Sequence, residues 1–254
     1  LTSALALAGL VLWAFAQRWR FPAALPERWT GLDWAWARGL WSVESLNTLW
    51  LAFASSVLGL ALALSFVLAE RQARPSARAS IGWTGAAVLP LLIPQMTLIP
   101  ALLLLDLTVL GLSPWALALW GHVMFTAAYA YLSLRGAVMS LDPRYGKAAL
   151  ALGRPPWQAL MLVELPVLLR PLMASVAIAL SVSVAAYLPT LTLGQGRLET
   201  FTVEAVAAAT GGSRRTAAQF ALSQAFWALL FFFAALAVPD LAHRNRRGLA
   251  ANVA

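Results

Sequence analysis

The 254-residue chain contains no cysteine, and this absence removes several kinds of chemistry at once. Disulfide frameworks, thiolate metal sites and cysteine nucleophiles are all excluded. Only two histidines are present, His122 and His243, so most histidine-based metal sites and catalytic triads are excluded as well. Charge is also scarce, since 11% of the residues are charged against about 25% in an ordinary soluble domain. We therefore expect neither catalytic residues nor a metal site.

Apolar residues, in contrast, make up 61% of the chain, well above the roughly 45–50% of soluble domains. Stretches of 24 to 28 residues without Asp, Glu, Lys or Arg occur at 45–69, 79–105, 107–134, 171–196 and 216–239. Each is long enough for a helix that crosses a bilayer, which needs about 20 residues, and lipid demands helices because it offers the backbone no partners. We predict an all-α, polytopic membrane helix bundle, a single domain over 1–254, with six transmembrane helices at about 1–17, 46–69, 82–105, 114–136, 170–192 and 217–239.

The first of these segments is the shortest. A cleaved signal peptide is the competing interpretation of residues 1–17, but no basic region precedes the apolar run. The chain begins with Leu1 rather than Met, so we expect either a trimmed N-terminus or a piece of a longer chain.

The net charge of +8 is explained by membrane topology. If both termini lie in the cytoplasm, 11 of the 18 basic residues fall on the inner side and 7 on the outer side. Basic residues collect on the cytoplasmic side of membrane proteins, so this orientation is favoured. The excess of basic over acidic residues therefore indicates contact with anionic membrane lipid and no nucleic-acid partner.

Two of the expected spans carry polar residues or breaks. Pro90, Pro94 and Pro100 fall in the third span, and each removes a backbone donor, so this helix must be kinked or broken. Such breaks are tolerated in membranes only where protein or a water-filled cavity covers the freed carbonyls. We name as candidates for a translocation path the polar residues near the break and in the hydroxyl-rich fifth span, namely Gln95, Thr97, Ser181, Ser183 and Tyr187. Packing between helices is the competing interpretation.

The most informative pattern lies in the loop at about residues 139–168, between the fourth and fifth spans. Asp142 and Pro143 predict the start of a short helix, and Gly153 predicts its end in a left-handed conformation. Pro155 and Pro156 then open a second short helix, which we expect to run to Leu165. Such an apolar-faced helical hairpin on the cytoplasmic side suits docking into the groove of a partner.

Within this loop, Lys147-Ala148-Ala149 is followed by Gly153 and by Val163-Glu164-Leu165-Pro166. The pattern resembles the signature of the permease subunits of binding-protein-dependent ATP-binding-cassette (ABC) importers with the type I (MetI-like) fold. That signature is Glu-Ala-Ala, then Gly six residues after the Glu, then Ile-x-Leu-Pro beginning ten residues further on. Lys147 departs from it by reversing a charge, so any salt bridge that relatives make there must be absent or reversed.

Two further features refine the resemblance. Tyr187-Leu188-Pro189-Thr190 with Gly194-Gln195-Gly196 resembles the branch that handles iron, sulfate, polyamines or thiamine. Fused permeases with two six-helix halves often carry one imperfect signature, so the chain is similar to the second half of such a permease.

The resemblance implies that the chain forms half of a solute path and that the hairpin, a coupling loop, transmits the closure of a cytoplasmic ABC ATPase dimer. The other expected partners are a second permease half (identical, homologous or fused) and an extracytoplasmic substrate-binding protein, at the bacterial cytoplasmic (inner) membrane. No Gly-x-x-x-x-Gly-Lys-Ser/Thr loop occurs, so the chain is expected to be no enzyme and to hold no cofactor, with ATP and Mg bound by the partner ATPase. The residues expected at the ATPase contact are Lys147, Ala148, Ala149, Leu152, Gly153, Trp157, Leu160, Met161, Leu165 and Pro166.

Two other functional classes are open to such a chain. An ion-coupled secondary transporter would need ionisable residues within its spans. The five complete spans are expected to lack Asp, Glu, Lys and Arg, with Asp106 between two of them, and His122 is better explained by hydrogen bonding between helices. An intramembrane enzyme is disfavoured because neither Gly-x-Ser-x-Gly nor His-Glu-x-x-His occurs.

Overall fold

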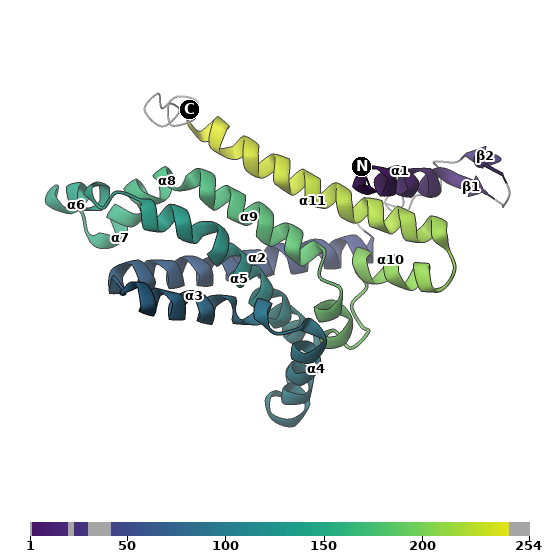
Figure 1. Ribbon diagram of the computed structural model, residues 1–254, viewed down its shortest axis with the longest axis horizontal. Coiled ribbons are helices and arrows are strands. Elements are labelled where there is room, and N and C mark those ends of the chain that lie inside the picture. The colour runs from purple at the N-terminus through teal and green to yellow at the C-terminus, as the bar shows by residue number, and fades with distance from the viewer. Residues whose placement is uncertain (1, 20–22, 30–41, 244–254) are drawn as a thin grey trace. The chain divides into compact units, whose positions relative to one another are not determined.

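The computed structural model describes residues 2–19, 23–29 and 42–243, and the described chain is helical almost throughout (Figure 1). The C-terminal residues 244–254, expected in the cytoplasm, lie outside the described residues. The helices are α1 (Thr2–Phe15), α2 (Val43–Ala73), α3 (Ala77–Leu92), α4 (Gln95–Leu105), α5 (Pro114–Ser140), α6 (Arg144–Ala151), α7 (Pro156–Ala159), α8 (Leu165–Val167), α9 (Leu169–Val184), α10 (Phe201–Thr210) and α11 (Arg214–His243). Three π-helical segments, η1 (Asp106–Leu110), η2 (Leu160–Glu164) and η3 (Pro189–Leu193), and a two-stranded antiparallel pair, β1 (Ala16–Arg18) with β2 (Arg28–Trp29), complete the described elements. The predicted all-α class is confirmed.

The expected number of six membrane spans is not confirmed by the described residues. Three helices are long and apolar enough to cross a bilayer, namely Val43–Ala73, Pro114–Ser140 and Arg214–Ala242. Two bent pairs, Ala77–Leu92 with Gln95–Leu110 and Pro156–Val167 with Leu169–Val184, raise the count to five if each pair is one span. The first expected span, at about 1–17, falls on α1, an apolar helix of 14 residues. The described residues therefore support three to five spans.

The predicted break in the third span is confirmed, and it lies at Pro94. The helix expected over 82–105 is two helices, α3 and α4, with a break between them. Ile93 is extended, with φ −86° and ψ 130°, because a following proline disfavours the helical conformation. Pro90 and Pro100 lie inside α3 and α4, so two of the three prolines are accommodated without ending a helix.

The fifth expected span, 170–192, is also interrupted. Helix α9 ends at Val184, and the separate segment η3 begins at Pro189. Proline has no backbone N–H and cannot continue the hydrogen-bond ladder of the helix before it, which accounts for a new segment starting there. The continuous helix expected to residue 192 is thus shorter by about two turns.

The chain divides into two compact units, each built from three segments. Unit 1 comprises Leu1–Ala54, Gln95–His122 and Val182–Leu229, and unit 2 comprises Ser55–Pro94, Val123–Ser181 and Leu230–Ala254, as far as the structure describes them. Unit 2 contains the predicted hairpin. The single permease domain over 1–254 stays a prediction.

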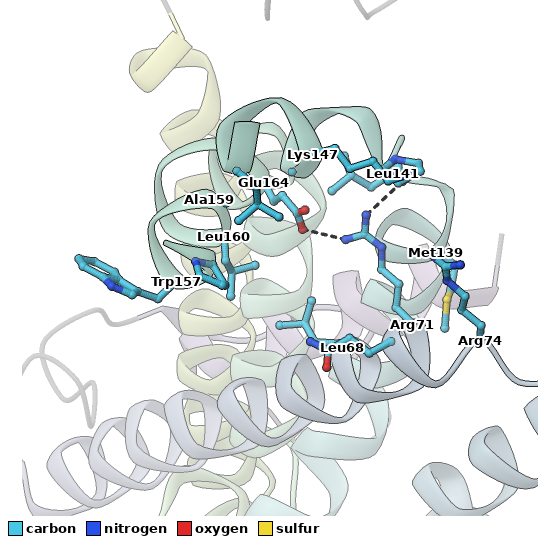
Figure 2. Close-up of a pocket in the computed structure, with 15 residues that line it drawn as sticks. Leu68, Arg71, Arg74, Met139, Leu141, Lys147, Trp157, Ala159, Leu160 and Glu164 are labelled. Carbon is cyan, nitrogen blue, oxygen red and sulfur yellow. Dashed lines mark hydrogen bonds and ion pairs between the residues drawn. The ribbon is translucent and has the colours of Figure 1, made fainter. Parts of the chain in front are cut away.

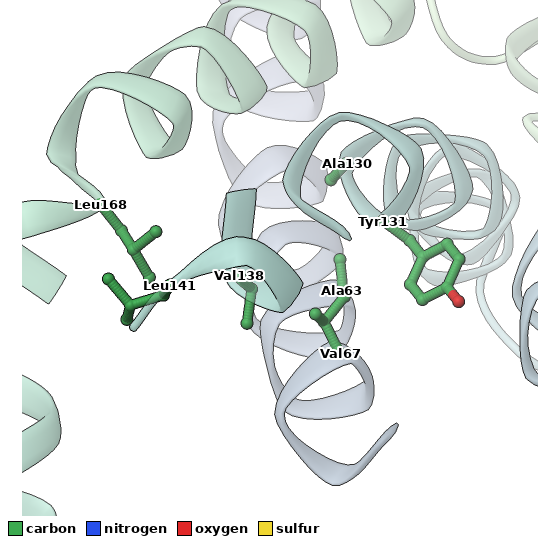
Figure 3. Close-up of a cluster of buried hydrophobic side chains, with 7 residues drawn as sticks. All are labelled: Ala63, Val67, Ala130, Tyr131, Val138, Leu141 and Leu168. Carbon is green, nitrogen blue, oxygen red and sulfur yellow. The ribbon is translucent and has the colours of Figure 1, made fainter. Parts of the chain in front are cut away.

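The core of unit 2 packs α2 against α5 directly beside the hairpin (Figure 3). Leu141, just before the hairpin, and Leu168, just after it, belong to the same buried cluster, so both ends of the hairpin are anchored in the helix packing. The other members of the cluster are Ala63, Val67, Ala130, Tyr131 and Val138.

Close approach of backbones supports this packing. A Cβ atom at Gly59 of α2 would overlap Thr126 Oγ1 and lie 2.9 Å from the backbone N of Ala127 on α5. The hydroxyl of Thr126 also donates a hydrogen bond of 3.0 Å to the carbonyl of Ser55. Small residues let membrane helices approach in this way, and the gain comes from van der Waals contact and hydrogen bonds.

Unit 1 joins α1 to the first turns of α11. Ala14 and Ala218 pack together, and the side-chain amide of Gln219 donates to the Ala14 carbonyl at 3.2 Å. The guanidinium of Arg214 lies 5.3 Å from the ring centre of Trp13, within the range of a cation–π interaction.

Candidate functional site

The hairpin (residues 142–166) begins and ends its first helix as the sequence predicts. The Oδ1 atom of Asp142 accepts a 2.8 Å hydrogen bond from the amide of Arg144 at the start of α6. Gly153 adopts φ +78°, the left-handed conformation expected after the helix. The amides of Gly153 and Arg154 donate to the carbonyls of Leu150 and Ala149, the two bonds of a Schellman motif. Local signals in the chain therefore determine this helix.

The second arm of the hairpin also follows the prediction, with a small extension. Pro155 is extended, Pro156 is the first residue of α7, and the helical path continues through η2 and α8 to Val167, two residues beyond the expected Leu165. The chain then bends by 79° into α9. Two short helical arms therefore lie between α5 and α9.

An ion pair joins this hairpin to α2. Arg71 Nη1 lies 2.7 Å from Glu164 Oε2, and Arg71 Nη2 donates to the Leu141 carbonyl at 3.4 Å (Figure 2). Gly146 on α6 is buried beneath the carboxylate, and a Cβ atom there would overlap Glu164 Oε1. The absence of a side chain at Gly146 thus allows Glu164 to reach Arg71.

A second ion pair, whose carboxylate is fully buried, starts from the adjacent residue of α2. Glu70 is 0% exposed and accepts hydrogen bonds from Arg135 Nη2 at 2.7 Å and from the Tyr131 hydroxyl at 2.8 Å, both on α5. The Ser80 hydroxyl of α3 donates to Glu70 at 3.1 Å and accepts from Arg135 at 2.6 Å. Neighbouring residues at the end of α2 therefore connect that helix to α3, to α5 and to the hairpin.

These charges lie inside helices, at or next to the ends of the expected spans. Glu70, Arg71 and Arg135 lie within the helices α2 and α5, and Asp106 is 2% exposed within η1, so the helical segments do contain charged residues. Each is engaged: three belong to the two ion pairs, and Asp106 Oδ1 accepts a 2.8 Å hydrogen bond from the Leu112 amide. Counting charge-free stretches placed these residues at span ends, but it could not show which helix ends meet.

The predicted contact residues divide by exposure. Lys147, Ala148, Leu152, Gly153, Trp157 and Met161 are exposed, Leu160, Leu165 and Pro166 are half-buried, and Ala149 is buried. Leu152 and Trp157 are 83% and 64% exposed, although both are large apolar side chains. Ala149 packs inside the hairpin and therefore supports the arm from within.

Two hollows flank the hairpin in unit 2. A cavity of about 810 Å³ lies between the last turns of α2, the end of α5 and the inner side of the hairpin, and it includes Lys147 and Trp157 (Figure 2). A groove of about 670 Å³ lies along the hairpin itself, with Tyr145, Leu152 and Leu162 on its walls. Exposed apolar groups beside hollows are typical of surfaces that bind another molecule.

The predicted path residues have different environments. Gln95 and Thr97 are exposed on the first turn of α4, Ser181 and Tyr187 are half-buried, and Ser183 is buried. Their role in a path stays a prediction.

His122 forms hydrogen bonds between elements of unit 1, as expected. Its Nδ1 lies 2.7 Å from the hydroxyl of Ser183 on α9, and its Nε2 lies 2.9 Å from the hydroxyl of Thr190 on η3. The Thr190 hydroxyl donates its single proton to the Ala186 carbonyl at 2.6 Å, so the network assigns the proton of His122 to Nε2. Both ring nitrogens of a neutral histidine are therefore satisfied.

The comparison with known families decides the class of this chain. Residues 4–240 match the family of binding-protein-dependent transport system inner membrane components. The chain belongs to this family. It is therefore an ABC permease, a multi-pass inner-membrane component of a transport system.

A curated relative agrees with this assignment. The chain is 33% identical over 161 residues to the inner membrane ABC transporter permease protein YnjC of Escherichia coli (strain K12). The alignment covers 63% of this chain and 32% of the relative, so this permease spans about a third of the length of the relative that it matches.

Proposed function

We propose that this permease is the transmembrane subunit of an ATP-driven importer and that the hairpin receives the motion of a cytoplasmic ABC ATPase dimer. Family membership supports the transporter class. The observation that carries the coupling role is the hairpin, in which Leu152 and Trp157 are exposed while Leu141 and Leu168 at its two ends are buried in the helix core. A force on the exposed part would therefore act directly on packed helices.

The connections at the end of α2 extend this argument. Arg71 ties the hairpin to α2, and Glu70 ties α2 to α5 and α3. Packed and charge-paired elements transmit displacement because close-packed interiors are hardly compressible. A movement of the hairpin would thus shift several membrane helices together.

The partners follow from this proposal. The ATPase dimer would bind ATP and Mg, and an extracytoplasmic binding protein would deliver the solute. This chain would form half of the translocation path, with Gln95, Thr97, Ser181, Ser183 and Tyr187 as its candidate lining. The other half would be an identical or homologous subunit, or a fused segment, which fits the greater length of the relative. Iron, sulfate, polyamines and thiamine are the candidate solute classes.

Ion-coupled transport has weaker support. His122 uses both ring nitrogens in hydrogen bonds, and the buried carboxylate of Glu70 is paired with Arg135. A coupling site needs a group that exchanges its ion, whereas these groups are held by partners within the protein.

Substitution of Gly153 tests the coupling role. Gly153→Val places a β-branched residue at φ +78°, which costs roughly 1–2 kcal/mol and distorts the turn between the two arms. We expect normal insertion into the membrane but loss of substrate-stimulated ATP hydrolysis and uptake in proteoliposomes that contain the complete transporter. Gly153→Asn is the matched control, because asparagine tolerates the left-handed conformation. Normal stimulated turnover in the valine variant would contradict the proposal.

A further inference from the structure

The cavity beside the hairpin has an unbalanced charge. Arg71, Arg74 and Lys147 all line it, whereas Glu164 is its single carboxylate among the described residues. Glu164 is already paired with Arg71. The side chains of Arg74 and Lys147 have no hydrogen-bond or ion-pair partner in the described part of the chain. Two cationic groups therefore remain available to an anion inside this cavity.

The same cavity has an apolar wall. Leu68 of α2, Met139 of α5 and Leu160 of the hairpin line it together with the cationic groups. A ligand that pairs with the two cations and also packs against the apolar wall must carry both an anionic group and a hydrocarbon portion. At about 810 Å³, the cavity is within the range of roughly 300–1,000 Å³ that ligand sites occupy.

The location of the cavity limits the source of such a ligand. It lies at the end of α2, a helix long and apolar enough to cross a bilayer, and Leu68 precedes Arg71 by one helical turn. Phospholipid phosphates lie at this depth, where apolar helix surface gives way to charged residues, and basic pockets between membrane helices bind anionic headgroups.

We propose that this cavity binds one anionic glycerophospholipid of the surrounding membrane, with its phosphate at Arg74 and Lys147 and its acyl chains on the apolar wall. The bound lipid would lie between α2 and the hairpin, next to the Arg71–Glu164 ion pair. This inference requires that the chain is a membrane protein, and it does not depend on coupling to an ATPase.

Lipid binding to the purified full chain tests the proposal. Native mass spectrometry would count dioleoyl phosphatidylglycerol and dioleoyl phosphatidylcholine retained by the protein in mild detergent. The double variant Arg74→Gln/Lys147→Gln should weaken phosphatidylglycerol binding by about 30-fold, roughly fivefold for each cation, and leave phosphatidylcholine binding unchanged. Unchanged phosphatidylcholine binding also reports that the variant is folded.

The matched control is Arg144→Gln/Arg154→Gln, which removes two cations from the same segment but from the groove on the other side of the hairpin. It should retain phosphatidylglycerol. Equal loss in both double variants would show general electrostatic attraction and overturn the site.

Two further experiments, a competition and a copurification, identify the source of the anion. Inorganic phosphate or glycerophosphoglycerol that displaces the lipid at millimolar concentration would show a site for a free phosphate and overturn the lipid assignment. In the copurification, the contrary result is an Arg74→Gln/Lys147→Gln variant that keeps its phosphatidylglycerol but loses an acidic protein that copurifies with the unchanged chain. That result would show that the two cations bind a protein partner, and it would also overturn the lipid assignment.

Discussion

At the scale of single residues, the buried charges carry the most structural information. Glu70 is fully buried and surrounded by Arg135, Tyr131 and Ser80, whereas the ion pair of Arg170 with Asp240 is largely exposed, at 42% and 69%. Removing one partner of a buried pair leaves an uncompensated charge, but exposed pairs contribute little. The Glu70–Arg135 and Arg170–Asp240 pairs should therefore respond very differently to the same kind of substitution.

Neutralising each carboxylate tests this contrast. Glu70→Gln should destabilise the protein by about 3 kcal/mol, because Arg135, whose side chain is 30% exposed, is left without its counter-charge. The expected fall in the apparent Tm is about 6 °C or more, measured by thermal unfolding in detergent. The control, Asp240→Asn, should lower the Tm by less than about 2 °C. Equal shifts in the two variants would mean that Glu70 makes no special contribution.

At the scale of elements, the position of the hairpin depends on a close approach of α6 to η2. Gly146 is buried against Glu164, whereas Gly136 of α5 has open space where a Cβ atom would lie. Both glycines are helical, so alanine would otherwise stabilise each helix by about 0.5–1 kcal/mol. At Gly146, the clash of the added Cβ atom with Glu164 should outweigh this stabilisation, so alanine should destabilise the protein there.

Alanine substitutions at these glycines measure how the hairpin is held. Gly146→Ala should push the Glu164 carboxylate, the far end of a flexible side chain, away from Arg71 and destabilise the protein by about 1 kcal/mol, whereas Gly136→Ala should be neutral or stabilising. Chemical denaturation in detergent would give both values. If the effect acts through the ion pair, Gly146→Ala combined with Glu164→Gln should cost no more than Glu164→Gln alone. Full additivity in this double-mutant cycle would contradict the steric explanation.

At the scale of the whole molecule, the orientation of the permease follows from the distribution of its basic residues. Arg74 in the turn between α2 and α3, with Arg71 and Arg78 in the flanking helix ends, is expected inside, while the turn between α10 and α11 is expected outside. This orientation would place the hairpin on the side where a cytoplasmic ATPase could reach it.

The lack of native cysteine makes this orientation directly measurable. Ala77→Cys, at the exposed first residue of α3, and Ser213→Cys, in the exposed turn before α11, introduce single thiols next to the two turns. In intact cells a membrane-impermeant maleimide should label Ser213→Cys and leave Ala77→Cys unlabelled until the membrane is permeabilised. The opposite pattern would invert the topology and contradict the proposed site of ATPase contact.

The sequence by itself determined the class and the local elements of this permease. Long apolar stretches and scarce charge predict helices in lipid, the three prolines at 90, 94 and 100 predict a break that the structure places at Pro94, and Asp142 with Gly153 predicts the ends of α6. These features can be predicted from the sequence because backbone sterics and helix capping act between residues only a few positions apart in the chain.

Only the tertiary structure decided which helix ends meet. Arg71 and Glu164 are separated by 93 residues of sequence and Glu70 and Arg135 by 65, so their pairing depends on how α2, α5 and the hairpin pack. The same holds for Gly146, whose role exists only because a distant carboxylate lies above it. The missing cysteines exclude disulfides and thiolate sites from the sequence alone, but the basic cavity that we propose as a lipid site exists only in the folded chain, where separate segments bring their charges together.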